Sequence, residues 1–217
     1  MTGRAGDTAS PSAVTGIANG GDARDTTGLV RALIVGTSLT AGLGLDPDSA
    51  YPALLQRMAD SAGLPVQIVN AGLSGETSAG ALRRIDWLLQ RPVELVLLET
   101  GANDGLRGLD IDSTEANLRR IIARVRARQP NARILLAQME APPNLGEAYT
   151  TRFREMFPTV AHEEGAGLVP FLLEGVAAVP SMNQGDGIHP NTRGARRVAQ
   201  NVWRTLGPEL ERLVRRR

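Results

Sequence analysis

The chain has 217 residues, of which 42% are hydrophobic and 22% are charged, and its formal net charge is +1. This length suits one domain with a well-buried core, and the balanced charge gives no electrostatic case for binding nucleic acid or an anionic membrane. The chain contains no cysteine and no lysine, which excludes disulfides, thiol catalysis, cysteine metal sites, Schiff-base chemistry, a Walker-type phosphate loop and a Ser–Lys dyad.

The first 28 residues are rich in Gly, Ser, Thr, Asp and Ala and hold almost no large apolar side chain. Such a segment buries too little surface to offset the entropy lost on ordering. We therefore predict a flexible leader over residues 1–28 and a single domain over residues 29–217. The leader lacks the basic start and apolar centre of a signal peptide, so the residues themselves leave the compartment open.

Five short apolar runs follow the leader, most of them bounded by Gly or Pro. They cover residues 29–36, 65–72, 93–101, 132–139 and, more weakly, 167–172. Runs that are apolar on both faces are typical of strands buried in a parallel sheet.

Helical spacing occupies the gaps between these runs. Apolar residues recur at intervals of three and four in the stretches 51–58, 82–89, 118–125 and 198–213, and we expect a further helix over 147–164. The Asp-Ser-Thr triplet at 112–114 is a candidate N-cap. This alternation predicts an α/β fold, a three-layer α/β/α sandwich around a five-stranded parallel sheet in the flavodoxin-like order 2-1-3-4-5.

Polar residues stand after the predicted strands. Ser38 follows the first run, Gly72 ends the second, Asn103 follows the third, and Asp186 and His189 lie just before the last helix. Because the carboxyl ends of parallel strands share one edge of a sheet, we expect these residues to converge.

Acyl transfer is the chemistry that uses such a set. A serine hydroxyl needs an imidazole to take its proton, and the imidazole needs a carboxylate to fix its tautomer. Asp186 and His189 are three residues apart in a turn bounded by Gly and Pro, so they can face one another. The candidate donors to the oxyanion are the Ser38 N–H, the Gly72 N–H and the Asn103 side-chain amide.

Each of these residues also has a purely structural interpretation. Ser38 suits a turn or a helix cap, and Gly72 suits a tight turn between strand and helix. Asn103 and Asp104 are residue types that commonly cap helices. The turn 186–189 is also a plausible entry into the last helix, with a proline fixing the backbone there.

The chain has only two histidines, so the choice of base is binary. His162 lies near the end of the helix expected over 147–164, where the helix dipole favours a solvated histidine. We therefore interpret His162 as a surface residue and His189 as the candidate base.

Four sequence blocks, GTSL, NAGLSGETS, GANDGLRG and DGIHP, carry a family resemblance. In this order they resemble the consensus blocks of the SGNH hydrolases, also called GDSL esterases, over about residues 30–210. Together with AYPALLQ at 50–56, they resemble more narrowly the bacterial multifunctional thioesterase/lysophospholipase/arylesterase branch. The resemblance implies the SGNH hydrolase fold, with Ser38 as nucleophile, Asp186 and His189 completing the triad, and Ser38, Gly72 and Asn103 as oxyanion donors. It implies no metal and no organic cofactor, and it is compatible with a periplasmic or secreted location as well as a cytoplasmic one.

The family's name motif has Asp where this chain has Thr37. We expect a side chain at that position to support the nucleophile's loop through hydrogen bonds, and a threonine hydroxyl can still bond a nearby backbone group. Activity is therefore expected to survive, and the change bears on the electrostatics and rigidity of the loop near Ser38.

The glycines around Leu106 and Arg107 predict a mobile loop at the edge of the site, and in the resembled branch this segment is a switch loop over the acyl site. A solvated surface charge is the alternative interpretation of Arg107. The stretch 139–145 and Met182 are positioned to line an acyl groove, with core or loop packing as the alternative. The predicted substrate-binding residues are Leu106, Arg107, Pro142, Met182 and Ile188.

We therefore expect a serine esterase that hydrolyses aryl and short- to medium-chain acyl esters, with acyl thioesters and lysophospholipids as further candidate substrates, through an acyl-enzyme on Ser38. Its partner is a small-molecule ester or thioester, and the oligomeric state stays open. The alternative in the same class is a carbohydrate O-acetyl esterase. A flavodoxin-like nucleotide module would need a G-x-G-x-x-G turn and more aromatics, and a phosphoacceptor receiver would need a lysine.

Overall fold

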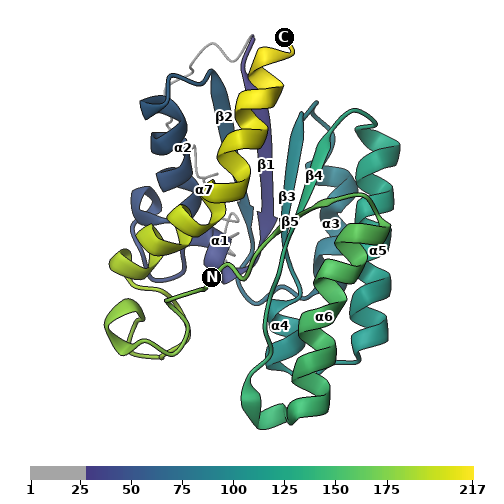
Figure 1. Ribbon diagram of the computed structural model, residues 1–217, viewed down its shortest axis with the longest axis vertical. Helices are drawn as coiled ribbons and strands as arrows, with labels where there is room; N and C mark the ends of the chain where they lie inside the picture. Colours follow the sequence, from purple (N-terminus) through teal and green to yellow (C-terminus); the bar gives the residue numbers. More distant parts are fainter. Residues whose placement is uncertain (1–27) are drawn as a thin grey trace, which may run out of the picture.

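The computed structural model describes residues 28–217, so the predicted leader lies almost wholly outside the described residues. Five parallel strands form one sheet in the order β2-β1-β3-β4-β5 (Figure 1). The strands are β1 (Val30–Gly36), β2 (Val66–Gly72), β3 (Leu95–Glu99), β4 (Arg133–Ala137) and β5 (Gly167–Val169). The predicted fold class and strand order are confirmed.

Helices cover both faces of the sheet and make the three layers (Figure 1). On one face lie α3 (Ser78–Leu88), α5 (Ile111–Arg128) and α6 (Glu147–Glu163), and on the other lie α2 (Tyr51–Ser61) and α7 (Thr192–Arg215). Two short helices, α1 (Ser38–Ala41) and α4 (Ala102–Leu106), follow β1 and β3 directly. Single 3₁₀ turns complete the set: η1 (Pro47–Ser49), η2 (Pro143–Leu145) and η3 (Pro180–Met182).

The strands bury side chains on both faces, as their apolar runs predict. Leu33 and Leu98 pack against α3, α5 and α6, whereas Ile34 and Leu97 pack against α2 and α7. All four are essentially inaccessible to solvent, and burying a leucine or isoleucine contributes roughly 1.5–3 kcal/mol. The central strands are thereby fixed in register, and with them the loops at their carboxyl ends.

Among the predicted boundaries that differ from those observed, two have a clear local cause. The N-cap of α5 is Asp110, whose side chain accepts the N–H of Ser113, so the triplet 112–114 lies inside the first turn of the helix. Strand β5 ends at Val169 because the next residue is Pro170, which has no N–H to donate to a neighbouring strand. None of the helices within residues 28–217 is long and apolar enough to cross a membrane.

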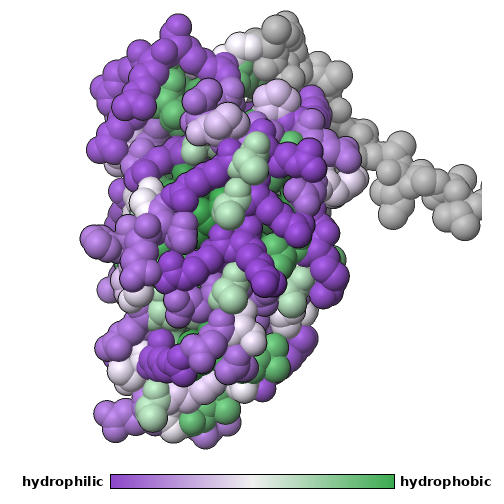
Figure 2. Space-filling view, turned by 90° about the vertical axis from the view of Figure 1, so that its right-hand side faces the viewer, coloured by the Kyte–Doolittle hydropathy of each residue, from purple (hydrophilic) through white to green (hydrophobic). Residues whose placement is uncertain are grey.

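The face covered by α5 and α6 is mostly hydrophilic, with hydrophobic residues in small separate areas (Figure 2). Arg119 of α5 pairs there with Glu115 and with Glu163 and Glu164 at the end of α6. Partly exposed ion pairs of this kind typically contribute up to about 1 kcal/mol each. This face joins two helices and carries none of the residues that the sequence singles out for chemistry.

Candidate active site

Strand β1 delivers Ser38 to the carboxyl edge of the sheet. The strand ends at Gly36 and α1 begins at Ser38, so the serine is the first residue of the helix and Thr37 is the N-cap. The cap interpretation of Ser38 is therefore wrong, because its hydroxyl does not cap the helix. Ser38 is 9% exposed, and its hydroxyl faces a histidine from the far end of the chain.

That histidine is His189. Its Nε2 lies 2.9 Å from Ser38 Oγ, and its Nδ1 lies 2.6 Å from Asp186 Oδ2. Both are hydrogen-bond distances, so the three side chains form an unbroken chain. Because Nδ1 faces a carboxylate, it holds the ring proton and leaves Nε2 to accept from the Ser38 hydroxyl.

The turn itself keeps the carboxylate of Asp186 ionised. Hydrogen bonds from the His189 side chain and from the backbone N–H groups of His189 and Ile188 lower the pKa of Asp186 to about 2. Gly187 adopts a φ of +70°, a conformation that favours glycine, and so allows the chain to fold back on the carboxylate. The negative charge therefore persists across the pH range in which an imidazole changes its protonation.

Two amide side chains hold the histidine turn in place. Asn191 caps α7 with its side-chain oxygen, which fixes the backbone immediately after the turn. The Gln184 N–H donates to the His189 carbonyl, and Gln184 Nε2 donates to the Leu43 carbonyl at 2.7 Å. Gln184 thus connects the histidine turn directly to the segment that follows α1.

Asn103 reaches the site from α4. It lines the same groove as Ser38, and its Nδ2 donates to the Glu76 carbonyl at 2.9 Å. A side-chain amide carries two N–H groups, so one remains for another acceptor. The next residue, Asp104, is buried and accepts the N–H of Ser78 at 2.8 Å, so it fixes α4 against α3. The N-cap of the following helix α5 is Asp110, so neither Asn103 nor Asp104 caps it.

Gly72 does not take the predicted role. Its N–H donates to Asn70 Oδ1 at 2.9 Å, so the predicted oxyanion donor is already engaged. A Cβ at Gly72 would lie 2.2 Å from the Ala41 nitrogen, so glycine allows β2 to pack closely against α1. The loop beyond it, residues 73–76, is the segment that Asn103 contacts.

A groove of about 590 Å³ opens beside Ser38. Three of the predicted substrate-binding residues line it: Leu106, Pro142 and Ile188. Met139, from the stretch expected to line an acyl groove, is there too. The segment after β5 adds lining residues that the sequence reasoning missed, namely Phe171, Leu173, Ala177 and Ala178. Phe171 belongs to the apolar run 167–172 expected to be a strand, and nothing in the local pattern of the other three marks them as groove residues.

Two predicted substrate-binding residues lie outside this groove. The Arg107 guanidinium donates to the Gly75 carbonyl at 3.1 Å, so it contacts the neighbouring loop. Met182 packs, partly buried, against the core cluster beneath α7. One side chain therefore contacts backbone and the other packs against the core, and their contact with a substrate stays a prediction.

Thr37 binds a buried carboxylate and not a backbone group. Its Oγ1 lies 3.0 Å from Glu99 Oε1, and its N–H donates to Glu99 Oε2 at 2.8 Å. Burial raises the pKa of Glu99 to about 7, although the hydrogen bonds from Thr37 and Thr40 oppose this shift. The sequence reasoning missed Glu99, whose one signal is a charged residue at the end of an otherwise apolar strand.

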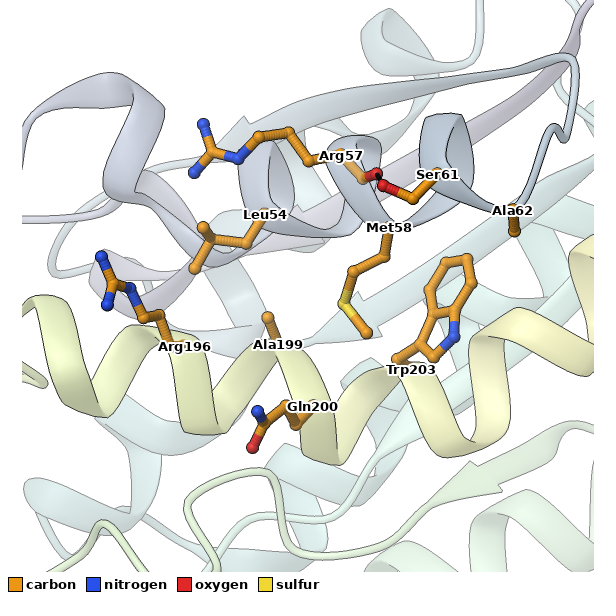
Figure 3. Close-up of a pocket in the computed structure, with 9 residues that line it drawn as sticks. All are labelled: Leu54, Arg57, Met58, Ser61, Ala62, Arg196, Ala199, Gln200 and Trp203. Carbon is orange, nitrogen blue, oxygen red and sulfur yellow. Dashed lines mark hydrogen bonds between the residues drawn. The ribbon is translucent and has the colours of Figure 1, made fainter.

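A larger hollow of about 790 Å³ lies between α2 and α7. Leu54 and Met58 from α2 and Trp203 from α7 point into it (Figure 3). It contains Ser61, but that hydroxyl donates to the Arg57 carbonyl, and the lining holds no histidine and no carboxylate. The remaining lining residues are Ala62, Arg196, Ala199 and Gln200.

His162, as expected, is exposed in the last turn of α6. Within residues 28–217, Ser38 is therefore the serine whose hydroxyl meets an imidazole.

An α/β/α sheet with a serine, a histidine and an aspartate in hydrogen-bonded sequence at its carboxyl edge has the arrangement of a serine hydrolase. Residues 34–197 match the model of the GDSL-like lipase/acylhydrolase family, and the chain belongs to that family.

The relatives agree with this membership. Esterase TesA of Pseudomonas aeruginosa is 43% identical over 180 residues, which cover 82% of this chain and 88% of that protein. Thioesterase 1/protease 1/lysophospholipase L1 of Escherichia coli K12 is 40% identical over 177 residues, 81% of this chain and 83% of that protein. The crystal structure of the esterase EstA from Pseudoalteromonas sp., inhibited by monoethylphosphonate, has a TM-score of 0.79 at 34% identity and covers 83% of this chain and 98% of that one. The predicted family is confirmed.

Proposed function

We propose that the chain hydrolyses carboxylic esters through a covalent acyl-enzyme on Ser38, with His189 as general base and acid and Asp186 as the group that orients it. The observation that carries the proposal is the continuous contact from Asp186 through His189 to Ser38 Oγ, over distances of 2.6 and 2.9 Å. Family membership supports it, because named relatives are an esterase and a thioesterase/lysophospholipase.

The reaction proceeds in two halves. In the first, His189 Nε2 takes the Ser38 proton while Oγ bonds to the ester carbonyl carbon, and Asp186 stabilises the resulting imidazolium. His189 then gives that proton to the departing alcohol or thiol, which leaves acyl-Ser38. In the second half, His189 takes a proton from water as the water attacks the acyl carbonyl, and it returns the proton to Ser38 as the carboxylic acid departs.

The oxyanion needs fixed donors where the negative charge develops. The Ser38 N–H at the start of α1 and the remaining Asn103 amide N–H are two of them. The Gly75 N–H takes the place of the Gly72 N–H in this proposal, because the latter is engaged by Asn70. Asn103 and Arg107 both donate to carbonyls of the loop that contains Gly75, which holds that loop at the site.

The size and lining of the groove support a proposal for the substrate class. Its lining beside Ser38 is predominantly apolar and includes Leu106, Phe171 and Leu173, and its volume is about 590 Å³. A groove of this size and character suits an acyl chain of several carbons better than an acetyl group. The proposed substrates are therefore aryl, alkyl or thiol esters of medium-chain acids.

A fluorophosphonate probe tests the nucleophile, and an ester series tests the substrate class. The probe should label Ser38, as located by mass spectrometry, and a label on Ser74 or Ser181 would reassign the nucleophile. Aryl esters of increasing acyl length should show kcat/KM rising beyond the acetate. A strict preference for acetate would favour the carbohydrate O-acetyl esterase.

A further inference from the structure

A buried carboxylate adjoins the turn that carries Ser38. Glu99, the last residue of β3, is completely inaccessible to solvent. Its Oε2 accepts the Thr37 N–H at 2.8 Å and the Thr40 hydroxyl at 2.7 Å, and its Oε1 accepts the Thr37 hydroxyl at 3.0 Å. Thr37 precedes Ser38 and Thr40 follows it by two residues, so one carboxylate binds the chain on both sides of the candidate nucleophile.

The short helix that begins at Ser38 needs such an anchor. Helix α1 spans only four residues, and the side chain of its N-cap, Thr37, makes no capping hydrogen bond. A helix this short has little stability of its own, so its orientation is set by what it contacts. The hydrogen bonds of Thr37 and Thr40 to Glu99 tie it to the central part of the sheet.

The residues around Glu99 leave space for its carboxylate. A Cβ at Gly36 would lie 2.5 Å from Glu99 Oε2, so glycine leaves the space that the carboxylate occupies. Tyr51 of α2 is the titratable group that faces it, through a 2.7 Å hydrogen bond to Thr40. On the α3 side, Arg84 is paired with Glu76.

Among the described residues, no arginine or histidine donates to Glu99. Burying a carboxylate without a cation carries a desolvation cost, which also appears in its pKa of about 7. Its only compensation is the set of donors that fix the Ser38 turn.

We propose that Glu99 is a positioning residue which, through Thr37 and Thr40, holds the turn so that Ser38 Oγ stays within hydrogen-bond distance of His189 Nε2. The inference rests on the proposed function and adds to it a residue that touches neither substrate nor reacting atoms. Displacing a reacting group by about 1 Å can cost on the order of 100-fold in rate. Loss of the anchor therefore lowers kcat, whereas KM, set by the groove, changes little.

Two substitutions of Glu99 separate hydrogen bonding from charge and size. In Glu99→Gln the amide oxygen can accept from the Thr37 N–H and the Thr40 hydroxyl, while its nitrogen donates to the Thr37 hydroxyl oxygen. Glu99→Leu fills a similar volume but offers no acceptor. We expect Glu99→Leu to lower kcat about 100-fold with KM within about twofold. Glu99→Gln should restore kcat to within about fivefold of the parent.

The readouts are steady-state kinetics on an aryl ester and the rate of fluorophosphonate labelling at Ser38, which reports nucleophile reactivity without substrate recognition. Glu94→Leu is the matched control. Glu94 precedes β3 at its opposite end and accepts the Arg31 N–H at 2.8 Å, so its loss removes a similar bond far from Ser38. Both the kcat and the labelling rate of Glu94→Leu should equal those of the parent.

If Glu99→Leu does not fold, Thr40→Val removes one donor at nearly constant size and should lower kcat about tenfold with KM unchanged. A folded Glu99→Leu with parental kcat and labelling rate overturns the proposal. Equal impairment of the Gln and Leu variants also overturns it, because the hydrogen bonds would then not account for the effect. The proposed function fails separately, if Ser38→Ala retains hydrolysis.

Discussion

Two hollows in the described part of the chain each contain a serine, and they differ in what surrounds it. The hollow between α2 and α7 is the larger, about 790 Å³ against about 590 Å³, yet Ser61 there donates to a backbone carbonyl. Ser38 in the smaller groove lies at the end of a central strand and meets His189. The comparison teaches that the carboxyl edge of the sheet, where distant loops converge, brings a serine hydroxyl to an imidazole, and that the volume of a hollow does not.

Replacing each serine in turn is the sharpest way to break the comparison. Ser38→Ala should reduce kcat by about four orders of magnitude or more, because it removes the atom that bonds to the acyl group. Ser61→Ala should leave kcat unchanged. Aryl-ester kinetics on both variants, with circular dichroism as the folding control, check this. Activity of Ser38→Ala near the parental level would end the distinction between the two hollows.

Removing an amide from each hollow has the next largest effect. Asn103→Ala should lower kcat about 100- to 1,000-fold, because it deletes one donor to the oxyanion. Gln200→Ala, its counterpart in the α2–α7 hollow, should have no effect on kcat. Kinetics on one substrate at saturation measure both. An Asn103→Ala enzyme within threefold of the parent would remove this residue from the oxyanion site.

The turn that carries Ser38 contacts a buried carboxylate, Glu99. The free energy of unfolding of the protein should therefore depend on pH. Folding raises the pKa of Glu99 from 4.5 to about 7, so between these values the folded chain binds more protons than the unfolded chain. The stabilising contribution of Glu99 to the free energy of unfolding is therefore lost as pH rises from about 4.5 to about 7. This loss is on the order of 3 kcal/mol at most, and the contribution does not change further at higher pH.

Urea unfolding at intervals from pH 4.5 to 8 measures this slope. Glu99→Gln should remove the part of the slope that comes from Glu99, because an amide does not titrate. Glu94→Gln should leave that part of the slope unchanged. An unaltered slope in Glu99→Gln would assign the pH dependence to other groups.

Placing a larger side chain in each hollow should have the smallest effect on activity. Ala177→Trp narrows the Ser38 groove and should lower kcat/KM for octanoyl aryl esters about tenfold, with the butyrate almost unaffected. Ala62→Trp enlarges a side chain in the α2–α7 hollow and should change neither value. A chain-length series on both variants provides the measurement. Equal losses on short and long esters would show that the acyl chain lies elsewhere.

The strand order and the convergence of three residues could be predicted because they follow from local patterns. Apolar runs bounded by glycine or proline indicate buried parallel strands, and the ends of such strands meet at one edge. The pairing of Asp186 with His189 lies within one turn, so it too is readable from the sequence. The contact of His189 with Ser38 agrees with the expectation that both residues lie at the carboxyl edge of the sheet.

Other features depend on packing between elements, which no local pattern records. The sequence does not tell which backbone N–H in the segment from Gly72 onward is free to bind an oxyanion. Only the contact with Asn70 shows that the Gly72 N–H is already engaged. The side chains of Arg107 and Met182 are long enough to point either into the groove beside Ser38 or away from it. Glu99 is the clearest case, because its partners lie 59 and 62 residues earlier in the chain.

Ser38 and His189 are separated by 151 residues, and Gln184 bridges the two segments by contacting Leu43. A nascent chain therefore cannot acquire hydrolytic competence until nearly all of it has emerged and α7 has docked. Turnover of a chromogenic ester would then serve as a real-time gauge of complete folding, silent in any intermediate whose carboxyl-terminal quarter is still loose.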